Sequence, residues 1–190
     1  MVHAFFVLIN QKHHFMKKNF LASFFAMLSL CANAQDFYID GILYKITGLY
    51  TVEVSSGDYY FGEKYTGDIV IPNKITDERN EIEFSVTSIG EKAFDSCSGL
   101  TSISIPKSVA SIGNAAFQGC TGLTSISIPE SVTSIGAGAF DGCTGLTSIS
   151  IPESVTSIGA RAFSVCRGLK SINIPSSVTS IEKSTFMDCI

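Results

Sequence analysis

The chain has 190 residues, and its 13 Lys and Arg against 17 Asp and Glu give a formal net charge of −4 at pH 7. Clustered basic residues of the kind that bind nucleic acid or anionic lipid are lacking, so both classes of partner are excluded. The three histidines, His3, His13 and His14, all lie in the first 15 residues, so the rest of the chain lacks the usual base of Ser-His and Cys-His nucleophile systems.

Residues 16–34 have the three parts of a secretory signal peptide. A positive region at 16–19 is followed by an apolar region at 20–30 and a small-residue cleavage site at 32–34. The apolar region is too short for a stable membrane-spanning helix, so no transmembrane segment is expected once the signal is removed. Residues 1–15 precede a good start at Met16, and we expect them to be an over-extended gene start. Together the two stretches predict a leader over residues 1–34.

A lipoprotein signal is the alternative, with Cys31 as the acylated residue, but bulky Leu30 stands where a small residue is expected. Cleavage after Ala34 is therefore preferred and predicts a secreted or cell-surface protein. It removes three lysines and no acidic residue, which shifts the net charge from −4 to −7. The mature chain, residues 35–190, is long enough to bury one real core.

The first part of the mature chain, residues 35–64, has β signals but no repeat. Extended segments at 37–39 and 42–44 flank Asp40-Gly41, a strong hairpin turn, and residues 51–54 form another β-rich segment. We predict that 35–64 is a β-rich N-terminal cap, because an open end of a repeat stack would expose an apolar layer and strand edges.

A degenerate first repeat follows in the predicted repeat array, residues 65–190. It is recognisable at 69–72 and 86–90, but the interval from Pro72 to Ile89 is 11 residues longer than the corresponding interval in the next copy. The added residues include the polar stretch 77–80, which predicts a small hairpin or loop projecting from the stack.

The dominant pattern is a 23-residue period in which a phenylalanine is followed three residues later by a cysteine. A unit this short cannot bury its own apolar face, so the copies must stack into a solenoid with one continuous core. The pairs are Phe94 and Cys97, Phe117 and Cys120, Phe140 and Cys143, Phe163 and Cys166, and Phe186 and Cys189.

The sequence of each repeat copy predicts three segments, and the copy at residues 123–145 serves as the example. Residues 124–128 alternate serine with isoleucine and end at Pro129, which predicts a strand of a parallel ladder. Residues 132–135 predict a second short strand. In residues 137–143 the apolar positions 139, 140 and 143 are three to four residues apart, which predicts a short helical turn.

The five repeated cysteines are not arranged as metal ligands, because they would form a row rather than converge on one point. Disulfides between adjacent coils remain an alternative, although an odd number of cysteines cannot all pair within one chain. We favour buried free thiols that pack as small apolar groups.

No enzyme signal survives in the sequence. Paired acids such as Glu130 and Glu153 follow prolines in exposed loops, and the glycine-rich windows lack the residues of phosphate loops. No catalytic residue, metal or cofactor is expected.

The pattern Leu-Thr-Ser-Ile-x-Ile-Pro-x-Ser-Val-Thr-Ser-Ile-Gly-x-x-Ala-Phe-x-x-Cys resembles the 23-residue leucine-rich repeats of the BspA-like bacterial surface proteins. The resemblance covers about residues 65–190 and every apolar position of several consecutive copies. It implies a leucine-rich-repeat solenoid and a secreted or cell-surface protein that adheres to host proteins or to other cells. It carries over no catalytic residues.

The candidate binding residues are short polar side chains that alternate with the isoleucines of the main strand. They are predicted to form two stacked columns on its outer face, which is either a plain solvated sheet face or a platform for a protein or glycan. The residues are Ser102, Ser104, Ser125, Ser127, Ser148, Ser150, Ser171 and Asn173.

Two functions remain open on the sequence alone. One is adhesion or protein interaction at a host or neighbouring cell surface, through this face or through the insertion at 77–80. The other is a structural spacer or stalk segment of a longer surface protein, with no ligand of its own. The repeat period is cut off one residue after Cys189, so we also expect a truncated gene or a fragment, and self-association through the uncapped last coil.

Overall fold

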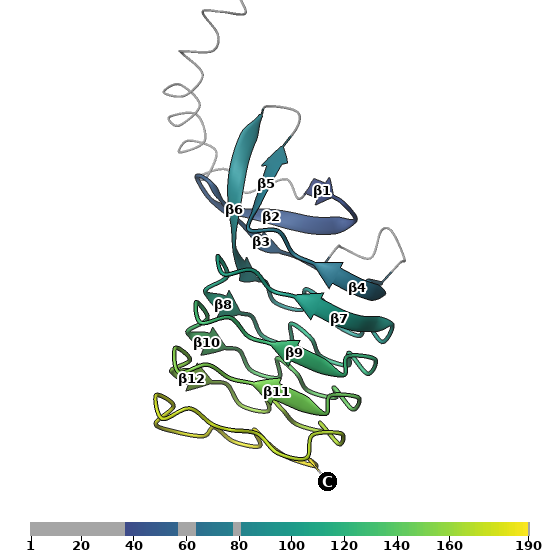
Figure 1. The fold of residues 1–190 in the computed structure, drawn as a ribbon, viewed down its shortest axis with the longest axis vertical. Coiled ribbons are helices and arrows are strands. Elements are labelled where there is room, and N and C mark those ends of the chain that lie inside the picture. Colours follow the sequence, from purple (N-terminus) through teal and green to yellow (C-terminus); the bar gives the residue numbers. More distant parts are fainter. Residues whose placement is uncertain (1–36, 57–63, 78–80, 190) are drawn as a thin grey trace, which may run out of the picture.

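The computed structural model describes residues 37–56, 64–77 and 81–189. The predicted leader lies outside these residues, as do the last three residues of the polar stretch at 77–80. Within them the chain forms a stack of coils, with a group of longer strands at one end and the last described coil at the other (Figure 1).

The strands predicted within residues 35–64 are confirmed as β1 (Phe37–Ile39), β2 (Ile42–Gly48) and β3 (Thr51–Val54). β1 and β2 form an antiparallel hairpin, and the residues of its turn, Asp40 and Gly41, both have positive φ, 50° and 78°. Those values suit the turn type that Asp-Gly favours between antiparallel strands.

The second short strand is confirmed in the coils up to residue 158 but not in the last described coil, and it belongs to the longest sheet of the described structure. Neighbouring strands run from β1 through β2 to β3, and from β3 onward they pair in parallel. The parallel members after β3 are β6 (Ile82–Ile89), β8 (Ser111–Ile112), β10 (Ser134–Ile135) and β12 (Ser157–Ile158). β3 therefore supplies the first rung of the ladder that the repeats continue.

The insertion in the first repeat is a hairpin, as predicted. β5 (Lys74–Asp77) pairs antiparallel with the first half of β6, and the second half of β6 joins the parallel ladder. The hairpin extends beyond the stack at its N-terminal end (Figure 1). Because β6 belongs to both parts, the hairpin is anchored to the core and is not a loose loop.

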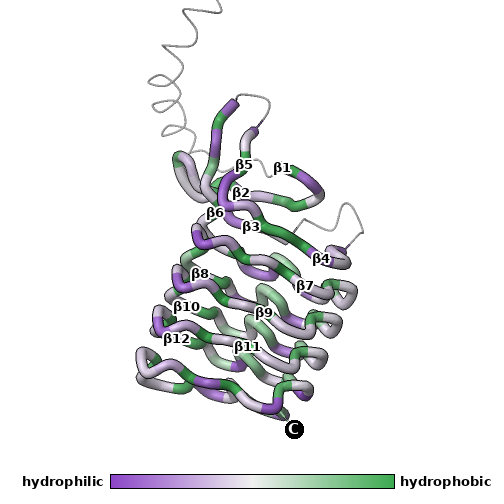
Figure 2. The backbone as a smooth tube through the Cα atoms, in the orientation of Figure 1, coloured by the Kyte–Doolittle hydropathy of each residue, from purple (hydrophilic) through white to green (hydrophobic). Residues whose placement is uncertain are grey.

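The main strands of the repeats stack in parallel on another side of the coil. β4 (Gly67–Val70) pairs with β7 (Leu100–Ser104), and β9 (Ser125–Ser127) pairs with β11 (Ser148–Ser150). In β7, β9 and β11 the isoleucines are buried and the serines are exposed, as the alternation predicts. Hydrophobic and hydrophilic residues recur at corresponding places in successive coils (Figure 2).

The predicted short helical turn is wrong: the described residues contain no helix, and residues 137–143 form a series of tight turns. The amides of Ala139, Asp141 and Cys143 donate to carbonyls three residues earlier, whereas those of Gly138, Phe140 and Gly142 donate to the next coil. Gly138 and Gly142 have φ of 61° and 75°, and a left-handed residue cannot continue a right-handed helix. The third side of the coil is thereby also hydrogen-bonded between coils.

Side chains at these left-handed positions are strained in some coils. In the next coil Val165 occupies the repeat position of Gly142. Its φ is 57°, a conformation that β-branched residues rarely adopt. We predict that Val165→Gly raises the free energy of unfolding by up to about 1 kcal/mol, since relief of the strain outweighs the entropy of glycine. Urea denaturation would measure it.

Gly142→Ala is the matched control for that prediction. A Cβ at Gly142 would have its nearest neighbours at 3.7 Å, so the substitution adds strain without a clash. It should lower stability by about 1–2 kcal/mol. Equal stability of both variants and the parent would show that the left-handed conformation carries no cost.

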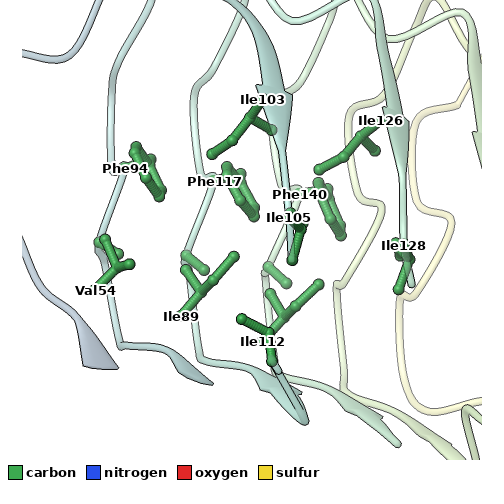
Figure 3. Packing of buried hydrophobic residues seen from close by; sticks show 14 of the residues in the cluster. Val54, Ile89, Phe94, Ile103, Ile105, Ile112, Phe117, Ile126, Ile128 and Phe140 are labelled. Carbon is green, nitrogen blue, oxygen red and sulfur yellow. The ribbon is translucent and has the colours of Figure 1, made fainter. Parts of the chain in front are cut away.

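The core is a set of ladders that run along the stack (Figure 3). Phe94, Phe117, Phe140 and Phe163 are fully buried, and their ring centroids are 5.1–5.4 Å apart with planes within 7° of parallel. Stacked aromatic pairs contribute about 0.5–1.5 kcal/mol beyond their buried area. The phenylalanine of the period is thus a packing residue.

Tyr65 closes the N-terminal end of this ladder. Its ring lies 4.9 Å from that of Phe94, tilted by 52°. The backbone N–H of Leu43, in β2, donates to the Tyr65 hydroxyl at 3.0 Å. A single side chain therefore covers the first phenylalanine and ties it to the N-terminal strands.

Candidate functional site

The outward face of the main strands, which we define by the eight predicted residues from Ser102 to Asn173, is exposed throughout. The structure brings these residues together in register: Ser125 lies beside Ser148, and Ser127 beside Ser150. The isoleucines between them, Ile126 and Ile149, point into the core. In the last described coil Ser171 and Asn173 are exposed, Ile172 between them is only half-buried, and the three residues form no assigned strand.

Some hydroxyl groups elsewhere in the repeat stabilise the stack. Ser131 and Ser154, which follow the proline of their coils, donate to backbone carbonyls of the preceding coil at 2.6 and 2.7 Å. Thr133 and Thr156 make similar bonds at 3.3 and 3.2 Å. These hydroxyls use their hydrogens to stabilise the contact between coils.

The serines of the outward face differ in this respect. The hydroxyls of Ser125, Ser127, Ser148 and Ser150 make no hydrogen bond within the part of the chain that the structure describes. They are exposed, small and held on a rigid ladder. What they offer is a flat set of free donors and acceptors, suited to binding and not to catalysis.

Asp68 extends this face and was missed by the sequence prediction. It pairs with Ser102 across β4 and β7, and the hydroxyls of Ser102 and Thr101 both donate to its Oδ1 at 2.7 Å. These two hydrogen bonds lower the pKa of Asp68, and the bond from Ser102 has the larger effect. Aligning the prolines Pro72 and Pro106 places Asp68 at the position of Ser102, so a signal was present.

The cysteines are core residues. Cys97, Cys120, Cys143 and Cys166 are buried free thiols, and Cys189 is a half-buried one, so the described cysteines form no disulfide. The thiols of the later four donate to the carbonyl of the phenylalanine one coil earlier, at 2.9–3.1 Å. The described residues also contain no group of three or more His, Cys, Asp or Glu able to hold a metal ion.

Burial keeps these thiols protonated. It raises the pKa of Cys120 and of Cys166 from 9.0 to about 12, and it raises that of Cys143 as well. A thiolate is the nucleophilic and metal-binding form, so these three buried thiols are unreactive at neutral pH.

The raised thiol pKa predicts a pH dependence of stability. Below about pH 9 the thiols are neutral in both the folded and the unfolded state, and the stability is fully present. Between pH 9 and 12 the unfolded chain ionises first, so the free energy of unfolding falls as pH rises. Urea midpoints at pH 7 and 10.5 measure the fall, and Cys120→Ala should make it smaller; an unchanged midpoint would contradict it.

A hollow of about 650 Å³ lies on the other side of the coil, over β8, β10 and β12. Its floor includes Gly113, Gly136 and Gly159, where an added Cβ would lie within 2.4–2.7 Å of the preceding coil's backbone. Glu91 and Glu182 border it from coils at opposite ends of the array. Because the two carboxylates are four coils apart, they cannot act as an acid and base pair.

A model of the BspA-type leucine-rich repeat region matches residues 55–190 in six copies. The chain is similar to a crystal structure of a leucine-rich repeat protein from Bacteroides ovatus, with 34% identity over 82% of this chain and a TM-score of 0.62. A second, from Bacteroides capillosus, has 30% identity over 72% of this chain, also with a TM-score of 0.62.

The Treponema pallidum leucine-rich repeat protein shares the fold at 24% identity over 82% of this chain, with a TM-score of 0.62. The matches span 45% of the B. ovatus protein, 96% of the B. capillosus protein and 78% of the T. pallidum protein. Comparison with curated proteins gives no match.

The described residues include no helix that is long and apolar enough to cross a membrane. The matches indicate no catalytic family. Six repeat copies over residues 55–190, together with the two Bacteroides structures, place the chain in the BspA-type leucine-rich repeat family.

Proposed function

We propose that the protein is a secreted or cell-surface module that mediates adhesion or protein interaction, and that its outward face contacts a macromolecule on a host or neighbouring cell. The observation that supports this most is the division among hydroxyls. Serines two residues after the prolines donate to the preceding coil, whereas Ser125, Ser127, Ser148 and Ser150 are left exposed and without an intramolecular partner.

The physical properties of the face suit such binding. Serine loses little side-chain entropy when it is ordered, and the ladder holds its backbone in place before a partner arrives. Successive coils repeat the same pair of residues, so an extended partner can contact several rungs at once and gain avidity. Export by the predicted leader, residues 1–34, belongs to this proposal.

The alternative is a spacer or stalk segment without a ligand of its own. The parallel phenylalanine rings and the three hydrogen-bonded sides favour a rigid rod, which suits that role too. Binding decides between the two functions.

The purified chain is immobilised, and its binding to fibronectin, fibrinogen and glycan arrays is measured. The proposal expects micromolar or tighter binding that is lost when Ser125, Ser127, Ser148 and Ser150 are all replaced by Lys. A control variant places four lysines at exposed positions elsewhere on the coils, at Ala137, Ser157, Thr179 and Ser180. It distinguishes the effect of the added charge from the effect of changing the outward face. Equal loss in both variants, or no ligand at all, would count for the spacer.

Self-association stays a prediction. In the last described coil Ile181 and Met187 are exposed by 50% and 38%, which leaves apolar surface at that end. Light scattering should show a mass that rises with concentration. A concentration-independent monomer mass would count against this prediction.

A further inference from the structure

We propose that Asp68 and Val70, at the N-terminal edge of the outward face, form a subsite for a lysine side chain of a protein partner. The inference rests on the proposed binding function of this face. It adds the type of partner side chain that the N-terminal end of the face would bind.

The Asp68 carboxylate is fixed in place by its neighbours. The hydroxyls of Thr101 and Ser102 both donate to Oδ1 at 2.7 Å, whereas Oδ2 accepts no hydrogen bond within the described part of the chain. A carboxylate with one oxygen occupied and the other free suits a compact ammonium group better than a guanidinium, which binds both oxygens at once. The geometry therefore favours lysine over arginine.

Val70 supplies the apolar half of the subsite. It follows Asp68 by two residues on β4, so the two side chains point to the same side of the sheet. Val70 is 72% exposed, the highest value among the exposed large hydrophobic residues of the described chain. A lysine could lay its four-carbon stem on Val70 while its ammonium reaches Oδ2 of Asp68.

A basic residue lies beside the opposite end of the face. Lys170 occupies the repeat position of Thr101 in the last described coil, and it is exposed. The stack thus places an acidic residue on the face at one end and a basic residue beside the face at the other. A partner that offers a cation at one end and an acceptor at the other fits this order, and a protein does so where an uncharged glycan does not.

The test titrates the full chain with Nα-acetyl-lysine amide and follows the Val70 methyl groups and the Asp68 carboxyl carbon by NMR. Saturable shifts are expected at both groups. Acetylation of the probe's ε-amine, which removes the charge, should weaken binding about two- to fivefold, the range for an exposed ion pair. Equal binding of the two probes, or tighter binding of Nα-acetyl-arginine amide, would overturn the proposal.

Variants locate the effect. Asp68→Asn should remove the difference between the charged and acetylated probes, and Val70→Ser should weaken both probes alike. Glu130→Gln, which alters another exposed carboxylate, should change neither. Thermal melts verify that each variant is folded, and selectivity that survives Asp68→Asn would refute the assignment.

The outcome separates this proposal from the function on which it rests. If the probes are discriminated at Asp68 but no macromolecule binds, the lysine subsite is supported and the proposed binding function is refuted. The opposite result is macromolecular binding that is lost in the four-lysine variant, is unchanged in Asp68→Asn and comes with no probe selectivity. It would support the proposed function and refute the subsite.

Discussion

Phe140→Ala is expected to lower the free energy of unfolding by about 3–5 kcal/mol, the cost of emptying a fully packed aromatic site. The ring has no exposed surface, and its centroid lies 5.2 Å from that of Phe117 and 5.4 Å from that of Phe163. Each coil of a repeat stack is stabilised mainly by its neighbours, so a cavity here also weakens the coupling between the two halves of the array. Urea denaturation followed by circular dichroism measures the loss.

Phe186→Ala is the matched control, because it removes the same side chain at the same repeat position. Phe186 is only half-buried, and it stacks on Phe163 at 5.7 Å. Its replacement should cost clearly less than that of Phe140. Equal losses would mean that the stack is not a continuous core.

Gly145→Ala is expected to destabilise the protein by about 1–3 kcal/mol, although glycine to alanine normally stabilises a compatible position by a few tenths to 1 kcal/mol. A Cβ on Gly145 would lie 2.3 Å from the carbonyl oxygen of Thr121 in the preceding coil. The neighbouring atom is backbone, so it can move only if the coils separate. The sign of the change is therefore diagnostic of close stacking.

Thr144→Ala, one residue earlier, controls for changes at this corner. Its side chain is exposed, so the change in stability should stay within about 0.5 kcal/mol. Thermal melts of the two variants under one set of conditions suffice. A stable Gly145→Ala variant would show that the coils are farther apart than described.

Much of the fold could be predicted because it follows from local rules. Asp40-Gly41 specifies a hairpin, the alternation in residues 124–128 specifies a strand with one buried face, and the period specifies stacking. The burial of Phe140 and Cys143 follows from the same period. These features depend on residue type and spacing alone.

The turn after the second strand could not be predicted in the same way. Residues three to four apart lie on one side of a helical turn, but the observed tight turns also bury Ala139, Phe140 and Cys143. The deciding feature is left-handed backbone at two positions per coil. Other coils place Lys92 or Arg161 there, with φ of 56° and 60°, so glycine does not mark the positions consistently.

The outward face was predicted from alternation, but its limits were not. Whether a serine binds the neighbouring coil or faces solvent depends on geometry between coils, as the contrast between Ser131 and Ser127 shows. Asp68 and Val70 occupy positions that are serine in the following coil, Ser102 and Ser104. A search for repeated serines therefore overlooks them. Pairing across strands, not residue type, assigns them to the face.

Cross-saturation NMR with a partner captured in the binding panel tests the central claim most directly. The partner is saturated, and the amides of the deuterated chain that lose intensity mark the contact surface. Binding through the outward face predicts losses at 102–104, 125–127 and 148–150, together with 68–70. Losses confined to 134–137 and 157–160, on the side of the hollow, would contradict it.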